Sequence, residues 1–211
     1  MRFGQHHQFI EKDDVRLALI NRAIAQFKFS AEQLKEPYLH KIDEHTALFL
    51  KGFGNEINLL SAFRDIYFNS RELLDLLLGR ISQQTASSGN QTPKDFLPFA
   101  KRLMCGDIDH LNLEIISFLK TNINYIFHIR KIRNEIKKNP SSVEFFFNTD
   151  HFEARMSLPI DKSEYELLEH LDIANLDEAK MKSSYACVIN LDIAFPEMLQ
   201  FWKAAFEIQQ H

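Results

Sequence analysis

The chain has 211 residues, of which 45% are hydrophobic, and its formal net charge is −4. This length fits one domain with a substantial core, and the negative balance excludes an overall basic field, so nucleic-acid binding requires a local basic patch. Only 6 glycines and 6 prolines occur, which favours long helices joined by few turns.

Apolar residues at helical spacing predict a first helix over Glu11–Leu34 and a second over Asn55–Gln84. The polar segment Thr85–Pro93 is predicted as a surface loop, with Thr92 as the N-cap of a short helix that Gly106 ends. We expect the first two helices to bury apolar faces. The residues are Val15, Leu19, Ala23 and Phe27 in the first, with Leu17, Ile20 and Ile24 broadening its face, and Leu59, Phe63, Ile66, Leu73, Leu77 and Ile81 in the second.

A third long helix is predicted over Ile108–Lys138, and Pro140 stops it because proline disfavours the helical conformation in the residue before it. The apolar period then changes from 3.6 to 2, which predicts a β-hairpin from Val143–Phe147 and Phe152–Leu158. Because three consecutive aromatics cannot share one strand face, two of Phe145, Phe146 and Phe147 are expected in the core or an interface, the alternative being a base-stacking platform.

The rest of the chain is predicted as a short helix over Asp161–Leu171 and a long helical region over Glu178–Gln209, bent or broken at Pro196. Trp202 is expected in the bundle core or a partner interface. The fold class is therefore mainly α: one domain over residues 1–211, an antiparallel bundle of about four long helices with a small β-hairpin insert at about 143–158.

Targeting and metal signals are weak. The N-terminal segment lacks the apolar stretch of a signal peptide, and no apolar run reaches the ~18 residues of a membrane span, so we expect a cytoplasmic protein without a membrane partner. Cys105 and Cys187 are expected to be reduced core thiols. No metal site and no cofactor is predicted, since these histidines lack ligand spacing: His6, His7, His40 and His45.

Arg133 is the most unusual residue of the chain. With Ile129 as reference and about 100° per residue, Arg133 falls near 40°, on the apolar stripe of its helix, and Asn134 near 140°. A guanidinium on such a stripe must be paired, extended to solvent or exposed in a cleft. It either pairs with Asp65, Glu72 or Asp75 of the second helix, or faces a groove or a symmetry mate and binds phosphate.

The densest basic cluster surrounds Arg133 and includes His128 and Lys131. The helix dipole by itself accounts for lysines in a last helical turn. On the second helix, two arginines lie one heptad apart and either form surface ion pairs or line the same groove as Arg133. Arg155 and Lys162 are further candidates. The candidate RNA- or phosphate-binding residues are Arg64, Arg71, Arg130, Arg133, Lys137 and Lys138.

A helical bundle whose late helix carries Arg, a polar residue, four further residues and then His resembles the HEPN superfamily, whose domains are often homodimeric RNases or RNA-binding modules. Arg133, Asn134 and Glu135–Lys138 match this motif, but Asn139 stands at the histidine position. Metal-free RNA cleavage needs a group that moves a proton near neutral pH, and an amide cannot do so. The resemblance implies a HEPN-like scaffold with a degraded site at Arg133, Asn134 and Asn139.

Three hypotheses follow. The first is a non-catalytic HEPN-like binding or interaction module that forms a homodimer and binds RNA or a protein. The second is an RNA-binding module or metal-independent RNase that uses Arg133 with a displaced histidine, for which the candidates are His110, His128 and His151. Of these, His128 lies about 140° around the helix from Arg133 and points elsewhere. The third is a structural protein in which Arg133 only fixes packing.

Overall fold

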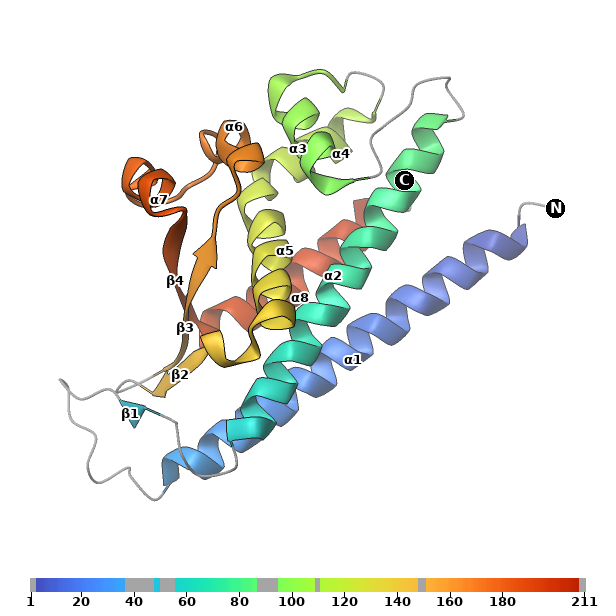
Figure 1. Ribbon diagram of the computed structural model, residues 1–211. Helices are drawn as coiled ribbons and strands as arrows, with labels where there is room; N and C mark the ends of the chain where they lie inside the picture. The colour runs from blue at the N-terminus through green and yellow to red at the C-terminus, as the bar shows by residue number, and fades with distance from the viewer. Residues whose placement is uncertain are drawn as a thin grey trace.

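The computed structural model describes residues 3–36, 48–49, 56–86, 95–108, 111–147 and 151–208, with the side chains of 3–13, 48–49, 56 and 84–86 left out. The chain is mainly helical with a small antiparallel sheet (Figure 1). The helices are α1 Phe3–Lys35, α2 Glu56–Ala86, α3 Phe96–Cys105, α4 Leu113–Thr121, α5 Ile123–Lys138, α6 Tyr165–Leu168, α7 Leu176–Lys182 and α8 Leu191–Ile208. The strands are β1 Leu48–Phe49, β2 Glu144–Phe147, β3 Phe152–Pro159 and β4 Ser184–Asn190.

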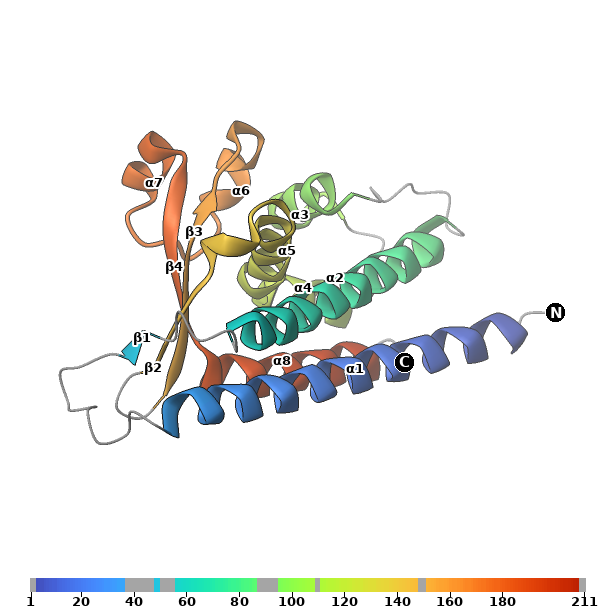
Figure 2. The ribbon, with the colours of Figure 1, turned by 60° about the horizontal axis from the view of Figure 1, so that its bottom comes forward.

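The two longest helices, α1 and α2, run antiparallel side by side in both ribbon views (Figures 1 and 2). Every α2 residue predicted to be buried is buried, and so are Ala23 and Phe27 of α1. Val15 and Leu19 are exposed, against the prediction. The buried stripe of α1 is formed by Ile20, Ala23, Ile24, Phe27, Ala31 and Leu34, and Ile20 and Ile24 agree with the predicted broadening of the apolar face.

The short helix α3 begins later than predicted. Its N-cap is Asp95, while Thr92, Pro93 and most of the predicted loop lie outside the described residues. Gly106 ends α3 as predicted, in the left-handed conformation with φ 82°. The N–H groups of Gly106 and Asp107 donate to the carbonyls of Leu103 and Arg102, which satisfies the last turn.

The predicted third long helix is two helices, α4 and α5, joined at Asn122. The Asn122 side chain donates to the Phe118 carbonyl at 2.8 Å, and its backbone leaves the helical region with φ −103° and ψ 10°. An asparagine side chain competes for helical carbonyls in this way and favours a break. The end of α5 at Lys138, two residues before Pro140, agrees with the prediction.

The predicted hairpin is confirmed as β2 and β3, and it forms part of a four-stranded antiparallel sheet in the order β1-β2-β3-β4. Phe145 and Phe147 point into the core, while Phe146 is half-buried on the opposite face. Strand β4 lies where the sequence predicted helix, so the expected helical region over Glu178–Gln209 is wrong over these seven residues. Pro196 lies inside α8, which continues to Ile208.

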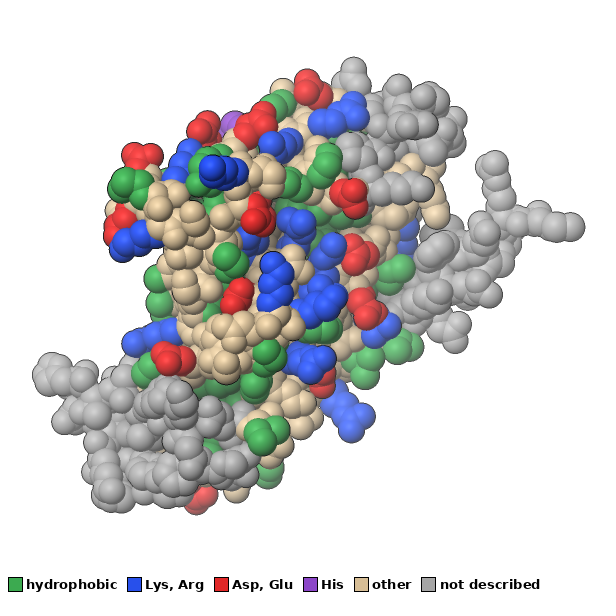
Figure 3. Space-filling model, in the orientation of Figure 1, with side chains coloured by type: hydrophobic (Ala, Val, Ile, Leu, Met, Phe, Trp, Pro, Cys, Tyr) green, Lys and Arg blue, Asp and Glu red, His purple; other side chains and the backbone are tan. Residues whose placement is uncertain are grey.

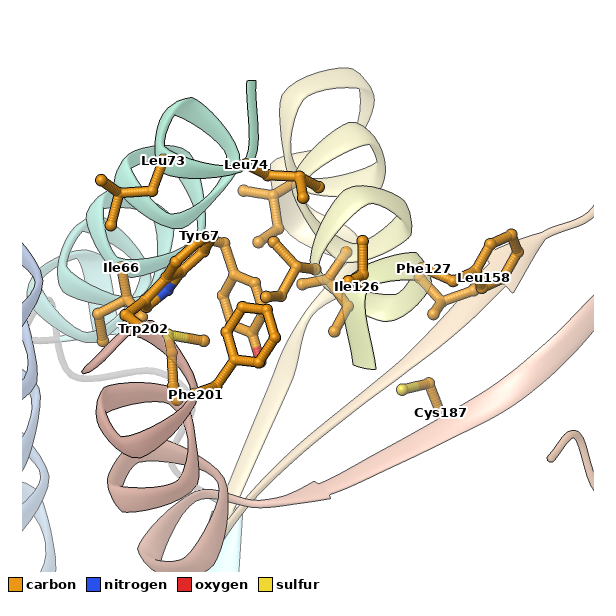
Figure 4. Close-up of a cluster of buried hydrophobic side chains, with 14 of the residues drawn as sticks. Ile66, Tyr67, Leu73, Leu74, Ile126, Phe127, Leu158, Cys187, Phe201 and Trp202 are labelled. Carbon is orange, nitrogen blue, oxygen red and sulfur yellow. The ribbon is translucent and has the colours of Figure 1, made fainter. Parts of the chain in front are cut away.

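The core joins the helices to one face of the sheet. Figure 4 shows Phe201 and Trp202 of α8 pointing toward Ile66 and Tyr67 of α2, with Cys187 of β4 at the far end of the cluster. Trp202 is fully buried within the chain itself. Cys187 is a buried thiol as predicted, but Cys105 is exposed, and both are free.

Phe27 of α1 connects distant parts of the chain. Its ring packs 6.4 Å from that of Phe63 and 5.4 Å from those of Phe145 and Phe195. One aromatic cluster therefore joins α1, α2, β2 and α8. None of the helices in the described parts of the chain is long and apolar enough to cross a membrane.

Candidate functional site

Two arginines from different helices share one aromatic ring where α2 packs against α5. The Cζ atom of Arg133 lies 4.8 Å from the centroid of the Phe68 ring, and that of Arg64 lies 5.0 Å from the same centroid. Cations over an aromatic face are attracted by the quadrupole of the ring. The attraction of both guanidinium groups to the Phe68 ring therefore offsets part of their mutual repulsion.

Arg133 is half-buried and incompletely bonded. Its Nη1 donates to Asn134 Oδ1 at 3.2 Å, and its buried Nε has no hydrogen-bond partner among the residues that the structure describes. Within the described residues, neither Arg133 nor Arg64 forms an ion pair with a carboxylate. Both guanidinium groups consequently keep hydrogen-bonding capacity for an anion.

Two of the three carboxylates predicted as partners of Arg133 are paired with other arginines. Glu72 pairs with Arg16 of α1, and Asp75 pairs with Arg71 four residues before it. The third, Asp65, forms no ion pair with Arg133 within the described residues, so the ion-pair prediction for Arg133 is wrong for all three carboxylates. The i,i+4 ion pair expected along α2 is present at Arg71.

A second pair of arginines, Arg71 and Arg130, lies along the same contact. Burial lowers the pKa of Arg130, the carboxylate of Glu164 raises it, and the positive charge of Arg71 lowers it again. The guanidinium of Arg130 lies 5.5 Å from the Phe96 ring centroid, and its Nη1 is 3.7 Å from Glu164 Oε1. Arg130 is thus held in place by Phe96 and Glu164.

Lys131, part of the predicted basic cluster, does not contribute to the surface. Its Nζ lies 2.8 Å from Glu164 Oε2, and the two side chains are only 6% and 4% exposed. The same Glu164 oxygen accepts the Asp161 N–H at 3.0 Å. This buried ion pair fixes the rotation of α5 and hence the direction in which Arg130 and Arg133 point.

The resulting surface is a local basic strip. Figure 3 shows lysine and arginine side chains gathered over α2 and α5, with acidic side chains along the α2 side. Lys137 and Lys138 are exposed at the end of α5, and Lys137 lies one turn beyond Arg133. We call this surface the basic seam; it consists of Arg64, Phe68, Arg71, Arg130, Arg133, Asn134, Lys137 and Lys138.

Asn139, compared above with a motif histidine, has a structural role. Asn139 is the C-cap of α5, and its backbone N–H donates to the Glu135 carbonyl at 2.7 Å. Its side-chain oxygen accepts from Ser141 Oγ at 2.9 Å, and its carbonyl accepts from Ser142 Oγ at 2.7 Å. Asn139 therefore organises the turn that leads into β2.

The described candidate histidines have their ring contacts elsewhere. His128 Nδ1 lies 2.8 Å from the Asn124 carbonyl, its ring packs edge-on to Tyr185, and burial lowers its pKa. His151 Nε2 lies 2.8 Å from Glu153 Oε1 on β3. The third candidate, His110, lies outside the described residues, as do His40 and His45 and the side chains of His6 and His7.

The two extra basic candidates are also separate from the basic seam. Arg155 donates from Nε and Nη2 to Glu153 Oε2 at 2.9 and 2.7 Å, and its guanidinium lies 4.2 Å from the Phe146 ring centroid. Lys162 is exposed in the 3-10 turn Lys162–Glu164. Over the described ranges, no group of three or more His, Cys, Asp or Glu side chains is placed to hold a metal ion.

Phe68 is the residue of the basic seam that sequence reasoning missed. It follows Arg64 by four residues and precedes Arg71 by three, so the three share one face of α2. That spacing was visible in the sequence, but the contact with Arg133 depends on how α2 and α5 pack.

Comparisons with protein-family models, with curated proteins and with solved structures find no match to this chain.

Proposed function

We propose that the chain is a non-catalytic, HEPN-like helical module that binds the phosphate backbone of RNA along the basic seam. The observation that carries the proposal is the pair Arg64 and Arg133 on one Phe68 ring, neither with a carboxylate partner among the described residues. In this proposal α1, α2, α5 and α8 are the four long helices of the HEPN-like bundle.

Phosphate suits the basic seam for geometric reasons. A planar guanidinium presents two parallel N–H groups to a phosphate, and two such groups lie against the Phe68 ring. Exposed Lys137 and Lys138 add point charges one turn further along. Because the whole chain carries a net charge of −4, the attraction is confined to this strip, which favours a short single-stranded segment.

We propose a non-catalytic module because RNA cleavage needs a side chain that transfers a proton, and the described candidates for this role do not supply one. Arg133 can stabilise charge on a phosphate but cannot act as acid or base near neutral pH. Asn139 caps α5, and His128 and His151 are hydrogen-bonded away from the basic seam. The alternative, a metal-independent RNase using Arg133, needs a displaced acid/base residue other than His128 and His151.

Salt-dependent RNA binding tests the proposal. Mixed-sequence single-stranded RNA is titrated at about 50 and 200 mM salt with wild type, Arg64→Glu and Arg133→Ala, and intact RNA is quantified in parallel. The charge-matched control is Lys203→Glu, an exposed lysine of α8. We expect both seam variants to weaken binding roughly tenfold and to reduce the salt slope by about 0.7 for each lost phosphate contact, with Lys203→Glu close to wild type.

Two results contradict the proposal in different ways. If wild type does not bind RNA, or if Lys203→Glu weakens binding as much as Arg64→Glu, the basic seam is not the RNA site. If wild type cleaves RNA and Arg133→Ala does not, the module is catalytic. Arg133→Lys keeps the charge but not the planar donor pair, so it separates loss of geometry from loss of charge.

A further inference from the structure

Strand β4 forms one edge of the sheet. It pairs with β3 over all seven residues from Ser184 to Asn190, and no described strand pairs with its other side. Figures 1 and 2 show β4 along the outer margin of the sheet, with α7 at one end of it. An edge strand directs half of its backbone N–H and C=O groups outward, where they can pair with another strand.

This edge lacks the features that usually prevent pairing. The sequence SYACVIN contains no lysine, no proline and no charged residue. The opposite edge is β1, which has only two residues. The outward-facing side chains of β4, Ala186 and Val188, are exposed, and hydrophobic side chains lie along the margin where β4 runs (Figure 3).

Exposed hydrophobic residues are concentrated around β4. Of the eight large hydrophobic residues exposed in the described parts of the chain, three lie between positions 181 and 193. These are Met181, Val188 and Ile193, with exposed fractions of 80%, 61% and 55%. Met181 and Ile193 lie six residues before and six residues after Cys187, the middle residue of β4.

We propose that β4 pairs antiparallel with β4 of a second copy of this chain, about a twofold axis near Cys187. Such pairing is self-complementary. It places Ala186 opposite the partner's Val188 on one face, Tyr185 opposite the partner's Ile189 on the other, and no charge against a like charge. At each end of the paired strands, the end of α7, which carries exposed Met181, comes near the start of the partner's α8, which carries exposed Ile193. The two sheets become one continuous sheet, and the interface does not involve the basic seam.

The oligomeric state of the full chain tests the proposal. Sedimentation equilibrium over a concentration series measures the dimer dissociation constant of wild type, Val188→Lys and Val188→Thr. In the paired strands the two residues at position 188 are diagonal neighbours about 7–8 Å apart, so two lysines there repel each other. We expect the dissociation constant to rise roughly tenfold or more for Val188→Lys and to change little for the β-branched, neutral Val188→Thr.

The matched control is Leu113→Lys, which makes the same apolar-to-lysine change at an exposed position of α4. Hydrogen exchange at low and high protein concentration locates the interface, and amides of residues 184–190 should gain protection as the dimer forms. A monomer at every concentration overturns the proposal. So does a dimer that Val188→Lys and Leu113→Lys weaken equally, or one that protects amides elsewhere and not in β4.

Discussion

The buried ion pair between Lys131 and Glu164 makes a quantitative prediction about stability. Both side chains are almost fully shielded from water, with Nζ 2.8 Å from Oε2. Removing the charge of one partner leaves the other uncompensated in the interior, at a cost of about 3–5 kcal/mol. Glu164→Gln is the sharpest change, because it keeps the size of the side chain and an oxygen that accepts the Asp161 N–H.

The two single variants should differ because the site is asymmetric. In Lys131→Met, Glu164 keeps Arg130, whose Nη1 lies 3.7 Å from Oε1. In Glu164→Gln, Lys131 loses its carboxylate altogether. We therefore expect Lys131→Met to be less destabilising than Glu164→Gln, and the double variant to lose clearly less than the sum of the two losses.

Urea unfolding followed by circular dichroism gives the free energy of unfolding for each variant. For a chain of this length, about 3–5 kcal/mol corresponds to a fall in melting temperature of about 6–20 °C. A loss below about 1 kcal/mol for Glu164→Gln would falsify the reasoning, since exposed ion pairs behave that way. Additive single losses would show that Lys131 and Glu164 do not depend on each other.

Three further predictions concern single residues. Gly106→Ala should destabilise the chain by about 1–2 kcal/mol, because the φ of 82° at Gly106 is unfavourable for a residue with a Cβ. Gly79→Ala should stabilise the chain by up to about 1 kcal/mol, because Gly79 lies inside α2 and no atom crowds its new Cβ. Burial lowers the pKa of His128, so below about pH 6.5 the unfolded chain binds more protons than the folded chain, and the free energy of unfolding decreases as pH falls. Thermal melts between pH 5 and 7 should show a weaker pH dependence for His128→Gln. Burial raises the pKa of Cys187 to about 11, so between about pH 9 and 11 the unfolded chain binds fewer protons than the folded chain. The free energy of unfolding therefore decreases as pH rises, by at most about 1.4 kcal/mol per pH unit from this group. Cys187→Ala should remove this contribution to the alkaline pH dependence.

Each of these has a result that contradicts it. Equal effects of the two glycine substitutions would mean that the left-handed conformation at Gly106 carries no cost for alanine. An unchanged acid profile in His128→Gln, or an unchanged alkaline profile in Cys187→Ala, would show that other groups account for the pH dependence.

Sequence periodicity predicted the elements whose pattern is strong and local. The buried stripe of α2 and the Phe145/Phe147 alternation follow from spacing alone, and both agree with the structure. Strand β4 was missed although Tyr185 and Cys187 alternate with exposed Ala186 and Val188. Seven residues between two helical patterns are too few for period 2 to outweigh period 3.6.

The candidate site, like the fold, was predicted only where the signal lies within one element. The angular position of Arg133 on the apolar stripe is a property of one helix, and the structure places this residue half-buried against α2 as that position indicates. Its contact is the Phe68 ring and not a carboxylate, because the choice depends on the relative rotation of α2 and α5. The Lys131–Glu164 pair helps to set that rotation, and nothing local to either residue reveals it.

The aromatic cluster around Phe27 has a consequence for synthesis on the ribosome. The α1–α2 hairpin can form as soon as it emerges, yet the partners of Phe27 on β2 and α8, Phe145 and Phe195, lie more than a hundred residues after Phe27 in the chain. Until α8 is released, the nascent chain presents an uncovered aromatic surface that chaperones bind and that promotes aggregation. Truncation before Leu191 should therefore give insoluble protein, even though every element of the basic seam is still encoded.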